Sequence, residues 1–174
     1  SISNNNTSVG FESMRGSLDS LHTQANKNTA IGAQSLKEIF SGDYNVALGS
    51  QALQNTGSGI GNTGTGYQSL YYNNDGNYNV AIGFQAGFGK DTNSWGHDLL
   101  EVGDSNVFIG YQAGYKENGS SKLYISNSKD NNLITGDFNS KELTFNADQA
   151  RVTGRLGING AGPYFTSNAL GVKG

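Results

Sequence analysis

A pattern of polar and apolar positions, nine residues long, recurs six times between residues 6 and 114. Its first position is Asn, its second and fourth are mostly β-branched or aliphatic, its third is usually small, its fifth is Gly and its seventh is Gln or Glu. The clearest copy is NVAIGFQAG at residues 79–87. Alternation with a period of two is typical of a β-strand, whereas a helix would carry an interior Gly in every copy. The pattern therefore predicts one short strand per copy.

The spacing of the copies predicts how these strands are arranged. The copies begin at Asn6, Asn28, Asn45, Asn62, Asn79 and Asn106. The middle four are 17 residues apart, and the outer intervals of 22 and 27 residues predict insertions. A repeat this short cannot bury its apolar face alone and must stack on its neighbours. Two short strands and two turns per repeat fit one coil of a β-solenoid, with coils about 4.8 Å apart.

Equivalent residues of stacked coils are expected to line up. The Asn and Gln positions predict two ladders in which each amide bonds its equivalent one coil away. The second and fourth positions predict the apolar core, and the small third position, at Ala30, Ala47 and Ala81, predicts a flat outer face that packs against another chain. The residues assigned to the structural repeat are Asn28, Ile31, Gly32, Gln34, Asn45, Leu48, Gly49, Gln51, Asn79, Ile82, Gly83, Gln85, Asn106, Ile109, Gly110 and Gln112. Because each coil supplies few large apolar side chains, we expect a thin core that needs association of identical chains.

The repeat resembles the head repeat of YadA-like trimeric adhesins, Asn-x-(Ala)-Ile-Gly-x-x-(Ala/Ser), and its relatives in phage tail fibres. The resemblance covers residues 6–114. It implies a left-handed parallel β-roll of about six coils, three chains wound around one axis, and an exposed attachment role. Two positions depart from the family pattern: Phe108 stands where a small residue is expected, and Thr65 where a core aliphatic residue is expected.

The pattern changes after Tyr115. Short alternating segments at residues 122–127, 133–138, 142–146 and 151–158 predict a β-meander. They resemble the segment that follows such heads in tail-fibre proteins, where a Leu-Tyr-Ile-x-Asn strand leads to a Gly-Asp-Phe strand, and residues 156–172 resemble a linker unit. The sequence therefore predicts a β-roll domain at residues 1–117 and a meander and fibre-linker region at residues 118–174.

Composition excludes several classes of protein. The net charge of −3 and the lack of a basic face argue against nucleic-acid binding. No apolar run approaches the ~20 residues of a membrane span, and the absence of Cys means that disulfides do not stabilise the chain. A start at Ser1 without a signal peptide suggests a fragment or a processed piece.

Most candidate chemistry in the sequence has a structural explanation. Residues 59–64 match Gly-x-Gly-x-x-Gly, but they fall at a repeat boundary in an all-β chain and predict a turn, not a cofactor site. The two His residues lack metal-ligand spacing. Asp43, Asp75 and Asp104 come shortly before a repeat Asn and suit Asx-turns, with calcium binding as the alternative. We expect no catalytic residues, no metal and no cofactor.

The longest insertion, at residues 88–105, holds the sharpest binding candidates. Trp95 and His97 lie beside Asn93, and glycans bind by stacking on aromatic faces with amides nearby. The alternative is that Trp95 packs against the roll or a neighbouring chain. Tyr71 and Tyr72 are the next candidates, although packing between coils or chains is the favoured interpretation for them.

These patterns predict a structural and receptor-binding segment of a trimeric fibre, either a phage tail fibre or a surface adhesin, that attaches to a cell surface through glycan. The expected location is extracellular, and the partners are two further copies and other fibre or baseplate segments. One alternative is a fibre-borne polysaccharide depolymerase, which needs a carboxylate pair; the candidates are Asp91, Asp98 and Glu101. The other is an ice-binding solenoid, although only Thr63 and Thr65 form the Thr pair that it requires.

Overall fold

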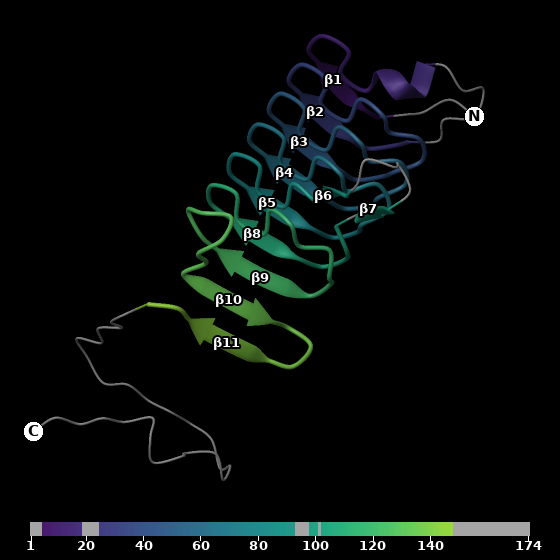
Figure 1. The fold of residues 1–174 in the computed structure, drawn as a ribbon. Coiled ribbons are helices and arrows are strands. Elements are labelled where there is room, and N and C mark those ends of the chain that lie inside the picture. Colours follow the sequence, from purple (N-terminus) through teal and green to yellow (C-terminus); the bar gives the residue numbers. More distant parts are fainter. Residues whose placement is uncertain (1–4, 19–24, 93–97, 101, 148–174) are drawn as a thin grey trace, which may run out of the picture.

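The computed structural model describes residues 5–18, 25–92, 98–100 and 102–147 (Figure 1). The described residues are all-β, without an α-helix, and most strands lie in one open nine-stranded sheet of order β1-β2-β3-β4-β5-β8-β9-β10-β11. Its strands are β1 (Thr7–Val9), β2 (Thr29–Ile31), β3 (Val46–Leu48), β4 (Thr63–Thr65), β5 (Val80–Ile82), β8 (Val107–Ile109), β9 (Lys122–Ile125), β10 (Ile134–Asp137) and β11 (Glu142–Phe145). A 3₁₀-turn η1 (Arg15–Leu18) follows β1, and β6 (Lys90–Thr92) pairs antiparallel with β7 (Asp98–Leu100).

Each of the first six strands of the sheet consists of the second, third and fourth positions of one sequence copy. Each pairs in parallel with the next copy and in register, and β5 pairs with β8 across the longest insertion. Successive turns of the chain lie along one axis, as Figure 1 shows. This arrangement is consistent with the predicted β-solenoid. It also needs the repeat Gly: at Gly83 the φ is +137°, and a Cβ would overlap the carbonyl oxygen of Gly110.

The faces of the strands are the reverse of those predicted. The third-position side chains Ala30, Ala47, Ala81 and Phe108 are fully buried, whereas the fourth-position side chains Ile31, Leu48, Ile82 and Ile109 are 37–46% exposed. The prediction that these four form the core, with Ala30, Ala47 and Ala81 on the outside, is therefore wrong for this chain. The inner face has small side chains at the third position because large side chains from the ninth position of the same copies fill the interior. These buried ninth-position residues are Leu36, Leu53 and Leu70.

Phe108 fits this interior because two glycines make room for it. The ninth position is Gly87 in the fifth copy and Gly114 in the sixth, and a Cβ at either glycine would overlap the Phe108 ring. Phe108 is fully buried and lies 6.0 Å, between ring centroids, from Tyr124 on the next strand. The sixth copy thus has Phe in place of the usual Ala at its third position and Gly in place of Leu at its ninth position, and its interior remains filled.

Both predicted amide ladders are present. In the buried Asn ladder, Asn45 Nδ2 donates to Asn28 Oδ1 at 3.1 Å and to the carbonyl of Gly59 at 2.8 Å. Asn45 Oδ1 in turn accepts the backbone N–H of Asn62 at 2.9 Å. These bonds join neighbouring repeats and satisfy polar groups that are shielded from water.

The Gln ladder runs in one direction along the sheet. Each Nε2 donates to the Oε1 of the preceding copy, at 2.7–3.0 Å from Gln51 to Gln112. It ends at Glu12, whose carboxylate accepts from Gln34 at 2.9 Å and pairs with Lys37 at 3.2 Å. The Gln34 bond, followed by the Lys37 bond, lowers the pKa of Glu12. A carboxylate suits this end because it accepts hydrogen bonds without leaving an unpaired N–H.

The sheet continues without a break from the repeats into the following strands. The backbone N–H of Lys122 donates to Asn106 Oδ1 at 2.8 Å, which is the bond that a further repeat Asn would make. Strand β9 therefore adds in parallel to β8, and β10 and β11 then add antiparallel. An ion pair of 2.6 Å between Lys122 and Asp137 joins β9 to β10. The fourth predicted meander segment, residues 151–158, lies outside the described residues.

Candidate interaction surfaces

The most extensive candidate surface is the outer face of the nine-stranded sheet. Its strand register aligns one row of mostly large apolar side chains: Val9, Ile31, Leu48, Thr65, Ile82, Ile109, Ile125, Ile134 and Phe145. Only Thr65 interrupts this row, and all nine side chains are half-buried or exposed. The adjacent row includes Val46, Val80, Val107, Leu123 and Leu143. A contiguous apolar face of this kind is typical of a protein–protein interface.

A column of aromatic rings borders the outer face. Phe84 stacks between Tyr67 and Tyr111, with ring centroids 5.2 Å and 5.4 Å apart. All three side chains are exposed. Because neighbouring rings cover each other's faces, the column presents mainly ring edges to solvent. It therefore extends the apolar surface and leaves little ring face open for stacking with a sugar.

A second aromatic cluster contains the predicted candidates Tyr71 and Tyr72. Phe88 stacks on Tyr71 and on Tyr115, with centroids 5.2 Å and 4.8 Å apart, and the Tyr72 ring meets Tyr71 edge-on. Both tyrosines are half-buried. The Tyr72 carbonyl accepts the N–H of Val102 at 3.3 Å, so the cluster lies at the base of the longest insertion. Asn93, Trp95 and His97, the other predicted binding residues, lie outside the described residues.

The aspartates considered for Asx-turns join neighbouring repeats instead of closing their own turns. Asp43 Oδ1 accepts the N–H of Asn26 at 2.7 Å, and Asp104 Oδ1 accepts the N–H of Asn77 at 2.7 Å. Asp75 accepts a bond from the Ser58 hydroxyl. Within the described part of the chain, no three acidic or His side chains gather as a metal site. The side chains of Asp91, Asp98 and Glu101 are outside what the structure describes.

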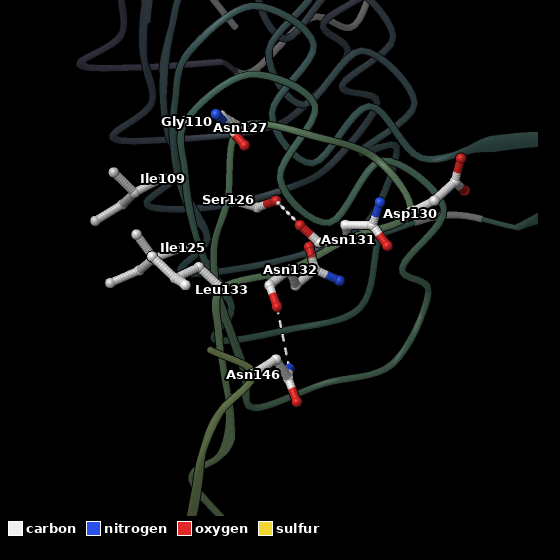
Figure 2. Close-up of a pocket in the computed structure, with 10 residues that line it drawn as sticks. All are labelled: Ile109, Gly110, Ile125, Ser126, Asn127, Asp130, Asn131, Asn132, Leu133 and Asn146. Atoms are coloured by element: carbon white, nitrogen blue, oxygen red, sulfur yellow. Dashed lines mark hydrogen bonds between the residues drawn. The ribbon is translucent and has the colours of Figure 1, made fainter. Parts of the chain in front are cut away.

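A groove of about 850 Å³ lies where the parallel strands meet the antiparallel ones (Figure 2). The side chains of Ile109, Ile125 and Leu133 point to one side in Figure 2, and the amide-bearing residues lie on the other. Its remaining lining residues are Gly110, Ser126, Asn127, Asp130, Asn131, Asn132 and Asn146. The groove therefore has an apolar wall, which continues the outer face, and a polar wall.

The polar wall is held in shape by Ser126, which is 6% exposed. The Ser126 hydroxyl accepts the N–H of Ser128 at 3.1 Å and lies 3.0 Å from the carbonyl oxygen of Asn131. Asn146 Nδ2 donates to the carbonyl of Asn132 at 3.1 Å, and Asn132 Oδ1 is buried without a hydrogen-bond partner among the described residues.

No sequence pattern points directly to this groove. The residues 131–132 are recognisable as a turn, but the wall forms only because the Ser126 hydroxyl bonds to residues 128 and 131.

A scan against protein-family models, a search of curated proteins and a search of solved structures each found no match. Within the described residues, no helix has the length and apolar character to cross a membrane.

Proposed function

We propose that the chain is a rod-like segment of a homotrimeric fibre, built as a left-handed β-roll of about six coils followed by a meander, that attaches to a cell surface. The observation that carries the trimer is the apolar row on the outer face, which runs across all nine strands. A soluble chain rarely leaves so long an apolar face in water. Packing against identical rows on two further copies would bury it at every level of the rod.

The attachment role rests on the repeat itself, which resembles the heads of trimeric adhesins and phage tail fibres. In this proposal the fibre is extracellular, on a virion or a bacterial surface, and its ends join other fibre or baseplate segments. The receptor is a surface glycan. In this proposal the chain acts as a binding module: among the described residues that line the groove, Asp130 is the single carboxylate, whereas glycoside hydrolysis ordinarily uses two.

Cell attachment by the purified protein tests this role. We expect the wild type to bind host cells and the Trp95→Ala variant to lose that binding, because a stacking ring at a hot spot contributes about 2 kcal/mol or more. Phe138→Ala is the matched control, since Phe138 is an exposed aromatic residue on the β10–β11 turn. No attachment by the wild type to any cell carrying surface glycans would refute the function. Equal attachment by Trp95→Ala would place the receptor site elsewhere.

A further inference from the structure

We propose that a hollow at the end of the last repeat binds an acidic sugar, one that carries a carboxylate or a sulfate group. The hollow has a volume of about 170 Å³, and its lining includes Tyr115, Lys116, Glu117, Tyr124, Lys129 and Asn132. The inference rests on the attachment function above and names a sugar class and a contact for it. It follows from the position of the hollow, from its charge and from an uncovered aromatic ring.

The hollow lies on the face of the sheet away from the apolar row that the proposed trimer buries. Tyr124 lines the hollow, and its neighbour on β9, Ile125, belongs to that row. Successive side chains of a strand point to opposite faces. Tyr124 continues the inner row from Phe108, whose ring centroid is 6.0 Å away. Packing of three chains through the outer row therefore does not cover the hollow.

Two lysines without an ion pair line this hollow. Lys116 and Lys129 are both exposed, and neither side chain pairs with a described carboxylate. In contrast, the cations at positions 15, 37 and 122 are each paired with Glu12 or Asp137. An ammonium group attracts an anion and can donate three hydrogen bonds to it. Two such groups in one hollow favour a carboxylate or a sulfate.

The carboxylate of Glu117 also lines the hollow, but three donors already engage it. Its Oε2 accepts the Tyr124 hydroxyl at 2.5 Å. Its Oε1 accepts the backbone N–H groups of Asn118 and Gly119 at 3.1 and 2.7 Å. Two lysines and one carboxylate leave the hollow with a net charge of +1, because two positive charges exceed one negative charge. The hollow is thus locally positive in a chain whose net charge is −3.

Tyr115 offers the sugar a ring face. Phe88 covers one face of Tyr115, with centroids 4.8 Å and ring planes 1° apart, and no second described ring stacks on the other face. Lys129 and Asn132 follow β9, which adds to the sheet one level beyond β8, so they approach Tyr115 from the side away from Phe88. A pyranose that stacks on the open face places its acidic group near the lysines, with the Asn132 amide as a further donor.

The size of the hollow limits what it can hold. Its volume of about 170 Å³ is below the ~300–1,000 Å³ of pockets that enclose a drug-sized ligand. It therefore takes the acidic group and one side of a terminal sugar, while the rest of the glycan stays outside. A neutral sugar can stack on Tyr115 but gains no attraction from the lysines. The hollow consequently favours sialic acids, uronic acids and sulfated sugars over their neutral parents.

A glycan array that pairs each acidic glycan with its neutral parent, probed with the full chain, tests the proposal. The best ligand is then titrated calorimetrically against wild type, Lys116→Gln, Lys129→Gln, the double variant and Lys141→Gln. Lys141 is the control because it is an exposed lysine on the β10–β11 turn and does not line the hollow.

We expect acidic glycans to bind and their neutral parents to bind much more weakly. Because exposed charge pairs are individually weak, affinity should fall about threefold in each single variant and about tenfold in the double variant. Lys141→Gln should bind like wild type. The wild-type affinity should also fall as sodium chloride rises from about 0.05 M to about 0.5 M, because salt screens exposed charges.

Several outcomes would overturn the hollow as a site for acidic sugars. Equal binding of acidic glycans and their neutral parents would contradict the charge argument, and undiminished affinity in the double variant would move the site. Competition by inorganic sulfate at the concentration of the sugar would reject the sugar as the ligand. Attachment of wild type to cells without binding to any acidic glycan would reject the hollow while leaving the attachment function standing. Absence of both would reject the two proposals together.

Discussion

Replacing Asn45 with Ala should destabilise the fold strongly, because this buried side chain joins three repeats. The change removes the acceptor of the Asn62 N–H and the Nδ2 donor to Gly59. Asn28 Oδ1 keeps its bond to the backbone N–H of residue 45, at 2.8 Å. Two buried groups therefore lose their partners, and at about 1–3 kcal/mol for each group the expected loss is about 2–6 kcal/mol.

Urea unfolding followed by far-ultraviolet circular dichroism, at a fixed protein concentration, measures this loss. The matched control is Asn139→Ala, an exposed position where we expect a change within about 0.5 kcal/mol. Asn45→Asp at pH 7 should be at least as unstable as Asn45→Ala, because a carboxylate would face the Gly59 carbonyl without a donor. A midpoint for Asn45→Ala that matches the control would refute the claim that the Asn ladder holds the repeats together.

Two further substitutions test other parts of the fold. Gly83→Ala should lower the thermal midpoint sharply, because Gly83 has a φ of +137° and a Cβ there would overlap the Gly110 carbonyl. Gly136→Ala is the control and should have a small effect. Equal midpoints for the two variants would contradict the close packing of the turns. The hydrogen bonds from Gln34 and then Lys37 lower the pKa of Glu12 in the folded chain. The Glu12 carboxylate therefore stabilises the folded state above its ordinary pKa of 4.5, and this stabilisation is lost as the pH falls through the folded-state pKa. Glu12→Gln should therefore be less stable than wild type at pH 7 and approach it in acid, as thermal melts across this range would show; a pH-independent difference would exclude the linkage.

The repeat made much of the fold predictable from sequence. The period of two, the invariant Gly and the 17-residue spacing predicted all-β structure, in-register stacking and both amide ladders. The direction of the faces was not predicted correctly, because alternation separates two faces without saying which is inside. The Asn ladder contained the missing information: the first and third positions share a face, so buried Asn45 requires buried Ala47 and outward Leu48.

The candidate surfaces were less predictable. Tyr71 was recognisable as a packing residue because aromatic residues recur at its position in the next two copies, at Phe88 and Tyr115. The groove depends on contacts between β8, β9 and the loop 126–132, where the repeat has ended and no pattern sets the loop's path. Asn127 and Asp130 consequently look like ordinary loop residues in the sequence.

Sedimentation equilibrium of the wild type and of Ile82→Asp tests the central claim, that the outer apolar face joins three chains. The account predicts a wild-type mass three times the chain mass of 18.3 kDa. It predicts a smaller species for Ile82→Asp, since an unpaired carboxylate at a buried interface costs several kcal/mol, and an unchanged mass for Asn139→Asp. A folded wild-type monomer of 18.3 kDa at micromolar concentration, with the β-sheet signal intact, would contradict the account.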